Sequence, residues 1–246
     1  MQRYFIHFAY DGTAYHGWQI QPNGVTVQEV LRRTLSMLLR AETSVIGAGR
    51  TDTGVHARRM TAHFDGSDDI DCAQLAYRLN NALPADIAVS GVERVPAHFH
   101  ARFSAVSRTY HYYVHTVKSP FLRTYSCELH YRLDFEAMNE AAALLTRYDD
   151  FAAFCKSGSD NKSTLCEVSE ARWTSIGEGQ WCFIITANRF LRNMVRAVVG
   201  TLIEVGRHRI DIETFRRIVE GKSRTAAGES MPACGLFLVD IVYPER

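Results

Sequence analysis

Stretches typical of strands and of helices alternate irregularly along this chain, and their order limits the folds it can adopt. An aromatic, β-prone run at residues 3–10 ends at the turn signal Asp11-Gly12. Thr26 and Glu29 then form a capping box that opens an amphipathic helix. Further strands are expected at 60–64, 110–115, 181–185 and 236–242, and further helices at 71–82, 135–147 and 189–205. Because the strict strand–helix rhythm of a parallel sheet is absent, the pattern predicts an α+β fold.

Composition excludes several classes of protein. The 246 residues are 46% hydrophobic and carry a formal net charge of +1, which suits one or two globular domains and excludes a uniformly basic surface. The six cysteines are far apart and form no CxxC pair, so we expect reduced thiols and no metal site. Neither a signal sequence nor a membrane span is evident, so the predicted location is cytoplasmic, with no membrane partner.

The most unusual local sequence is the glycine-rich loop at residues 47–57, GAGRTDTGVHA. Its glycines indicate a tightly bent loop that a ligand can approach closely, with the carboxylate of Asp52 between them. The spacing resembles a dinucleotide-binding GxGxxG motif, but the third glycine is missing; a Walker loop is excluded because no Gly-Lys-Ser/Thr follows. Asp52 is therefore either a functional carboxylate or a turn residue that caps backbone amides or pairs with Arg50.

Two basic clusters are candidates for contact with nucleic acid. Residues 95–125 contain seven aromatic side chains and no acid, together with the basic residues Arg102, Arg108, Lys118 and Arg123. Such a mixture suits a surface that neutralises phosphates and stacks bases, although a β-sheet with buried aromatics would give the same pattern. At helical spacing, Arg189, Arg192 and Arg196 would form one stripe opposite an apolar face, either as a solvated face or as a phosphate contact.

Several longer motifs in this order resemble the bacterial tRNA pseudouridine synthase A family, and the resemblance runs from end to end. The motifs are YDGT at 10–13, GWQ at 17–19, TVQ at 26–28, the loop at 47–57, RTY at 108–110, FLRNMVR at 190–196 and GLFLV at 235–239. One departure is Thr53, where the family more often has Ala after its catalytic Asp. A small residue is kept there, so the assignment of Asp52 is unaffected.

The resemblance implies two pseudo-symmetric RNP-like, or ferredoxin-like, α+β halves. Each half would have an antiparallel sheet with helices on one face, and the active cleft would lie between them. We expect residues 1–101 to carry the Asp loop and residues 102–246 to carry the Tyr, Arg and Leu of the cleft. The resemblance also implies a homodimer that binds tRNA. Its expected reaction is the isomerisation of uridine to pseudouridine at positions 38, 39 and 40 of the anticodon stem-loop, without a cofactor or a metal.

Matching motif residues suggests individual roles. By resemblance, Asp52 is the catalytic nucleophile, and Arg196 is the arginine paired with it. Tyr110 contacts the target base, and Leu236 lines the apolar pocket. The remaining expected RNA contacts are Arg50, Arg58, Arg102 and Arg192.

Two other interpretations remain open. An RNP-like RNA-binding protein without catalysis would use the same aromatics, but it gives no reason for an acid in a basic cleft. A small-molecule enzyme that binds phosphate in the glycine-rich loop would lack the Lys and Ser/Thr that such loops use. His56 and His63 are close to Asp52 in sequence, and we expect them to have structural or RNA-contact roles.

Overall fold

The computed structural model describes residues 1–158 and 162–245. The small, polar and basic residues within 149–164 predict a surface loop, and three of its residues lie outside the described ones. The chain forms two compact units. Unit 1 consists of Met1–Val106 and Phe237–Arg246, and unit 2 consists of Ser107–Leu236. Both contain antiparallel strands and helices, so the prediction of an α+β fold is confirmed.

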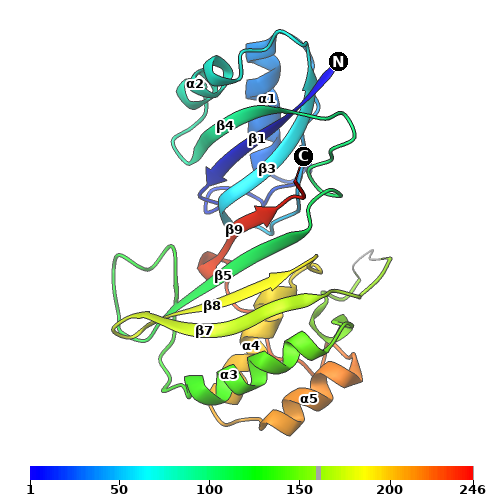
Figure 1. Cartoon of the computed structure of the whole chain (residues 1–246). Coiled ribbons are helices and arrows are strands. Elements are labelled where there is room, and N and C mark those ends of the chain that lie inside the picture. The colour runs from blue at the N-terminus through cyan, green and yellow to red at the C-terminus, as the bar shows by residue number, and fades with distance from the viewer. Residues whose placement is uncertain (159–161, 246) are drawn as a thin grey trace. The chain divides into compact units, whose positions relative to one another are not determined.

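The sheet of unit 1 is built around β1 (Gln2–Tyr10), which pairs antiparallel with β3 (His56–Gly66) on one side and β4 (Ile87–Val95) on the other. The short β2 (Ile46–Gly47) pairs with the far half of β3. β9 (Leu236–Val242), drawn in red in Figure 1, runs parallel to the start of β3, where His56 pairs with Phe237. The last strand of the chain therefore lies against the strand that follows the Asp52 loop.

Two helices of unit 1 begin where side chains cap them. α1 (Val27–Leu39) begins after Thr26, whose hydroxyl accepts a hydrogen bond from the Glu29 backbone N–H. α2 (Cys72–Ala82) begins after Asp71, whose carboxylate accepts from the Gln74 N–H at 3.0 Å. In Figure 1, α1 lies behind the strands of this unit.

Successive side chains of β1 point to opposite faces of the sheet, and side chains on both faces are buried. On one face, Tyr4 stacks on Phe64 and Phe8 packs against Trp18. On the other face, Phe5 packs against Phe99 and Tyr243, which come from the segment after β4 and from the C-terminal segment. The C-terminal residues therefore cover part of the sheet begun by the N-terminal strand.

Unit 2 has an antiparallel sheet in which β8 (Gln180–Ala187) lies between β5 (Ser107–His115) and β7 (Val168–Gly177). The short β6 (Cys127–Glu128) pairs parallel with the end of β5. The helices of this unit are α3 (Phe135–Leu144), α4 (Met194–Gly206) and α5 (Ile212–Gly221). α4 is the most buried of them, because both of its faces are largely apolar. Across the described residues, no helix has the length and apolar character needed to cross a membrane.

Candidate active site

The loop that carries Asp52 leads from β2 to β3 and is bonded to the segment that follows β1. The Trp18 backbone N–H donates to the Thr51 carbonyl at 3.1 Å, and the Gly54 N–H donates to the Tyr15 carbonyl at 3.4 Å. These two bonds lie on either side of Asp52 in the sequence. The residues before and after the carboxylate are therefore both fixed to residues 15–18.

Two glycines of the segment after β1 allow this close approach. Gly17 has a φ of +81°, and a Cβ there would collide with the Thr51 carbonyl oxygen and lie 3.0 Å from the carbonyl carbon of Asp52. A Cβ on Gly12 would collide with the carbonyl oxygen of Val55. Backbone therefore packs directly on backbone at both ends of the Asp52 turn, and a larger residue at either glycine would displace the turn.

A buried histidine fixes the end of the loop. Nδ1 of His56 lies 3.0 Å from Oδ1 of Asp11, and the His56 side chain is 1% exposed. Its ring stacks on Phe237 of β9, with 4.4 Å between the ring centroids. His56 thus links the turn after β1 to the C-terminal strand, which supports the structural role expected for it.

The side chain environments differ along the loop. Asp52 is half-buried, whereas Thr53 and Arg50 beside it are exposed. Arg58, on β3, is exposed, and its guanidinium lies over the Phe237 ring at 5.3 Å from the centroid. The next residue, Arg59, is ion-paired with Asp240 at 3.0 Å.

Arg102 lies in unit 1 but away from the Asp52 loop. The neighbouring Ala101 N–H donates to His63, which is at the opposite end of β3 from His56. Seven residues of strand separate the two histidines, a length of roughly 23 Å. Of the expected RNA contacts in this unit, Arg50 and Arg58 are within six residues of Asp52 in the sequence, and Arg102 follows the residue bonded to His63.

The other expected site residues belong to unit 2. Tyr110 is a buried residue of β5 and packs edge-to-face against Phe190, with 5.0 Å between centroids. Arg196, in the first turn of α4, is half-buried, and its Nε donates to the Met231 carbonyl at 2.6 Å. Leu236 is buried at the start of β9, and Arg192 is exposed. Arg196 and Leu236 thus belong to unit 2, whereas Asp52 belongs to unit 1.

The expected helix at 189–205 begins later than predicted. α4 starts at Met194, because Asn193 before it adopts a left-handed conformation with a φ of 66°. The Asn193 side chain donates to the Ser230 hydroxyl, which holds this turn. Arg189 and Arg192 therefore precede the helix, and the prediction that they form a helical stripe with Arg196 is wrong.

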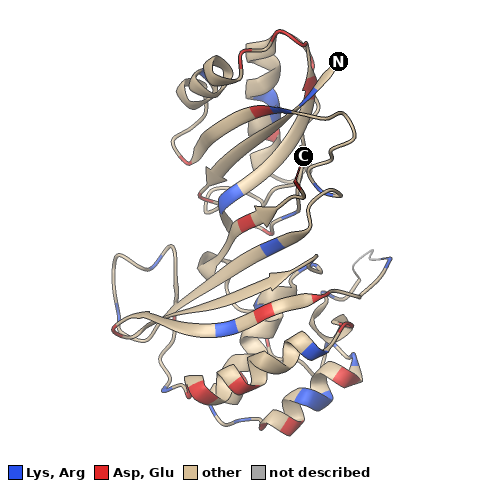
Figure 2. Cartoon of the chain, viewed as in Figure 1, with Lys and Arg blue, Asp and Glu red and all other residues tan. Residues whose placement is uncertain are grey.

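Residues 189–225 contain nine Lys and Arg against four Asp and Glu, and ion pairs reduce the basic character of this segment. Figure 2 shows basic and acidic residues interspersed on α5, where Arg216 is paired with Glu213 at 3.6 Å. Glu204 binds both Arg207 and Arg209, at 3.1 and 3.3 Å, and Lys222 binds Asp150 at 2.8 Å. Much of the positive charge counted in the sequence is therefore compensated within unit 2.

Sequence reasoning missed the residues that brace the loop. Asp11 appeared as part of a turn signal and of the YDGT motif, but nothing local relates it to His56, 45 positions later. The positive φ of Gly17 likewise follows from contact with Thr51 and Asp52, which are far along the chain. Among the described residues, no group of three or more His, Cys, Asp or Glu side chains could hold a metal ion.

Comparison with known proteins agrees with this geometry. The family model described as tRNA pseudouridine synthase matches residues 6–104 and 141–244. Proteins named tRNA pseudouridine synthase A are similar over the full length of the chain. That of Bacteroides fragilis is 53% identical over all of this chain and 98% of that protein, and that of Bacteroides thetaiotaomicron is 54% identical over all of this chain and 92% of that protein. That of Caldicellulosiruptor bescii is 39% identical over 99% of this chain and 100% of that protein.

The matched stretches include the Asp52 loop and its bracing segment in unit 1, and Arg196 and Leu236 in unit 2. With relatives about half identical from end to end, the chain belongs to the tRNA pseudouridine synthase family.

Proposed function

We propose that this protein isomerises uridine to pseudouridine at positions 38, 39 and 40 in the anticodon stem-loop of tRNA, with Asp52 as the nucleophile. The observation that carries the proposal is the bracing of the Asp52 turn by residues 12–18 in a chain of this family. A catalytic carboxylate must be held in one place, and a turn packed backbone on backbone supplies that rigidity.

The reaction breaks the bond from ribose C1′ to N1 of uracil and rejoins the base through C5. Asp52 could attack C1′, attack C6 of the ring, or abstract the 2′ proton. All three routes need an ionised carboxylate, and a neighbouring guanidinium favours the charged form. In the proposal this guanidinium is that of Arg196, whose Nε is already held by the Met231 carbonyl.

The other roles follow from the same chemistry. The target base must leave its stack, and Tyr110 is proposed to hold the flipped base and to help remove the C5 proton. Leu236 is proposed to exclude water, which would hydrolyse an intermediate at C1′. Residues 1–101 would thus supply the nucleophile and residues 102–246 the groups around the base, in an active cleft between the halves.

We also propose that the two halves are related by pseudo-symmetry, as RNP-like or ferredoxin-like folds. In unit 1, the chain order β1, α1, β2, β3, α2, β4 gives the sheet order β4-β1-β3-β2. In unit 2, apart from the two-residue β6, which pairs with β5, the chain order β5, α3, β7, β8, α4, α5 gives the sheet order β5-β8-β7. In both units the first strand pairs with the third, and the third pairs with the second.

Tritium release tests the proposed reaction directly. C5 must lose its hydrogen when it becomes the glycosidic carbon, so an anticodon stem-loop transcript with 5-tritiated uridine should release tritium to water. We expect release that requires the protein and leaves one pseudouridine for each tritium lost. Tight binding of the transcript without release would instead support an RNA-binding protein that does not transform its ligand.

Neutralising Arg58 is expected to weaken tRNA binding. If its guanidinium contacts a phosphate, Arg58→Gln should reduce the slope of log K against log salt by about 0.7 to 0.9. The control is Arg78→Gln, which removes the same charge from the exposed surface of α2. Equal slopes for the two variants would contradict a specific phosphate contact at Arg58. The same proposal extends to Arg50, Arg102 and Arg192.

A homodimer is expected from the family resemblance. Light scattering at working concentration should give about twice the 27.8 kDa mass of the chain. A mass of one chain that still supports full turnover would contradict the dimer. Since the proposed substrate is tRNA, the proposed location is the cytoplasm.

A further inference from the structure

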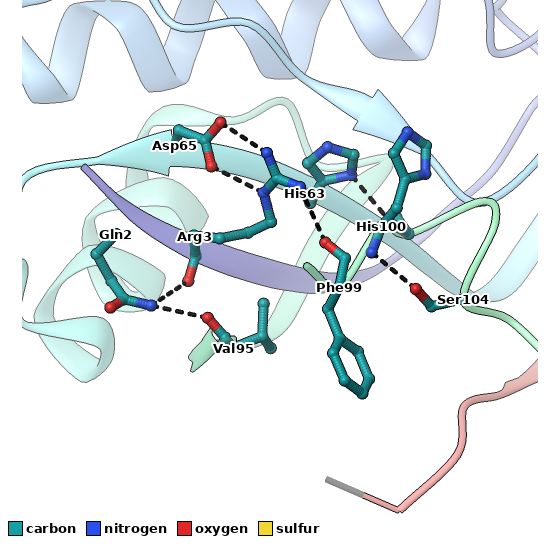
Figure 3. A network of polar contacts seen from close by, with 9 residues as sticks. Gln2, Arg3, His63, Asp65, Val95, Phe99, His100 and Ser104 are labelled. Carbon is teal, nitrogen blue, oxygen red and sulfur yellow. Dashed lines mark hydrogen bonds and ion pairs between the residues drawn. The ribbon is translucent and has the colours of Figure 1, made fainter. Parts of the chain in front are cut away.

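A cluster of polar contacts at the end of unit 1 away from Asp52 holds a turn at residues 99–104 (Figure 3). Nδ1 of His63, on β3, accepts a hydrogen bond from the Ala101 backbone N–H at 3.1 Å. Nδ1 of His100 accepts from the backbone N–H groups of Arg102 and Phe103, at 3.1 and 3.3 Å. Two imidazoles therefore bind three successive amides of one turn.

Further bonds fix the same turn from outside it. An Arg3 guanidinium N–H donates to the Phe99 carbonyl at 3.1 Å, and the Tyr243 hydroxyl donates to the Ala101 carbonyl at 2.6 Å. The backbone N–H of His100 donates to the Ser104 hydroxyl at 2.9 Å. Hydrogen bonds from β1, β3 and the C-terminal segment therefore all hold this one turn.

The protonation states suit these bonds, because an imidazole nitrogen accepts only when it carries no proton. Burial, together with the positive charges of His100 and Arg3, lowers the pKa of His63 to about 4. Burial and the charges of Arg3 and Arg102 also lower the pKa of His100. Both rings are therefore neutral acceptors at neutral pH.

This bracing presents an aromatic ring and a cation to solvent. Phe103 is 75% exposed, although a Phe side chain is normally buried. The Arg102 guanidinium lies over that ring at 5.5 Å from its centroid, and the centroid of the His100 ring is 4.4 Å from that of Phe103. A rigid, exposed ring with a guanidinium beside it offers a stacking surface and a phosphate contact within one nucleotide.

The charge around the ring also suits RNA. Asp65, the carboxylate of the cluster, receives two hydrogen bonds from Arg3, at 2.8 and 2.9 Å. Its charge is therefore compensated by a bidentate pair, and no acid occurs between residues 96 and 127. RNA that approaches Phe103 can therefore contact Arg102 without repulsion from an uncompensated carboxylate of this cluster.

We propose that Phe103 and Arg102 form a docking surface for an unpaired nucleobase of the RNA substrate and its adjacent phosphate, and that His63 and His100 are positioning residues for that surface. The inference rests on the proposed function, because it assigns a second contact region to the same RNA. It places this contact beside His63, seven positions along β3 from His56, which ends the Asp52 loop. Binding should therefore depend on it, whereas the chemical step should not.

The first test compares variants at the surface itself. Binding of the tRNA transcript is measured in the Asp52→Asn background, so that the RNA is not converted. Phe103→Ala should raise Kd about 5- to 150-fold, the range for loss of one base–aromatic stack, and Phe103→Trp should restore binding. Arg102→Gln should reduce the salt slope by about 0.7 to 0.9, whereas Phe103→Ala should leave it unchanged. The control is Tyr77→Ala, which removes another exposed aromatic from α2 of unit 1.

The second test concerns the positioning residues. His63→Asn keeps an acceptor near the position of Nδ1, and His63→Leu removes it, so only the Leu variant should raise Kd. The double variant His63→Leu, Phe103→Ala should bind little worse than Phe103→Ala, because the first change acts through the second residue. In the active protein, KM should rise while kcat stays within about twofold. His63→Asn and Phe103→Trp keep the test valid if His63→Leu does not fold.

Distinct results would overturn the inference and the proposed function. If Phe103→Ala binds RNA as tightly as Tyr77→Ala, the proposal of a docking surface is wrong, even when tritium is released normally. The same holds if the effects of His63→Leu and Phe103→Ala on Kd add fully in the double variant. If Phe103→Ala changes the mass of the protein but not its affinity for RNA, the surface contacts a second copy instead. If the unchanged protein neither binds the transcript nor releases tritium, the proposed function fails first.

Discussion

Replacement of Asp52 by Asn is expected to reduce the rate of pseudouridine formation by on the order of 10⁴-fold or more, the loss that follows removal of a group on which covalent chemistry depends. Asn has the same shape and fits the same turn, but its amide cannot act as a nucleophile or a base. The bonds that hold the turn come from the backbone of its neighbours, so they remain. Tritium release under single-turnover conditions measures the loss.

The affinity of Asp52→Asn for the transcript should distinguish a loss of chemistry from misfolding. The Kd for the transcript is expected to stay within a few-fold, because one side chain among many RNA contacts is changed and no contact is removed. Asp68→Asn, at an exposed carboxylate of the same unit, should leave both the rate and the affinity unchanged. An Asp52→Asn protein that turns over at the normal rate would exclude Asp52 as the nucleophile.

Gly17→Ala is expected to lower kcat by at least about 100-fold, the scale of loss for a misplacement of about 1 Å in a reacting group. The new methyl group would collide with the Thr51 carbonyl oxygen and press on the backbone of Asp52. A left-handed Ala also costs roughly 1 to 2 kcal/mol. The turn must therefore shift, and Asp52 would move with it.

The control for this prediction is Gly91→Ala, in β4, where a Cβ meets nothing within 4 Å. Both variants should be compared by urea unfolding and by tritium release below their unfolding transitions. Gly17→Ala should lose turnover even where it is fully folded, and Gly91→Ala should not. Normal kcat in folded Gly17→Ala would show that the close backbone approach is unnecessary for the position of Asp52.

Elements with strong local signals could be predicted from the sequence. The strand at 236–242 has the bounds expected from its apolar run, and α1 begins after Thr26 as its capping residue indicates. β4 and β7 were missed, because irregularities in strand pairing, between His7 and Phe8 opposite β4 and between Val168 and Glu170 in β7, interrupt the period of two. The start of α4 was misplaced because the left-handed Asn193 depends on its bond to Ser230, 37 residues away.

In the candidate site, too, residues with local sequence signals could be predicted, and residues that depend on distant contacts could not. Asp52 could be chosen from its glycine-rich loop and from the family motif, because both are local sequence features. The partnership of Asp11 with His56, and the histidine acceptors behind Phe103, come from strand pairing between distant residues. The periodicity of hydrophobic residues in the sequence does not reveal such contacts. A single sequence therefore indicates a candidate carboxylate, but not which residues hold it in place.

The parallel pairing of β9 with β3 has a consequence for biosynthesis. Phe237 is added 181 residues after His56, so a growing chain on the ribosome passes through most of its length before the ring that covers His56 exists. Contacts of such sequence separation form late and slowly. The support that β9 gives to the end of the Asp52 loop can therefore form only after residue 237 has been added, and a shorter nascent chain lacks the ring that covers His56.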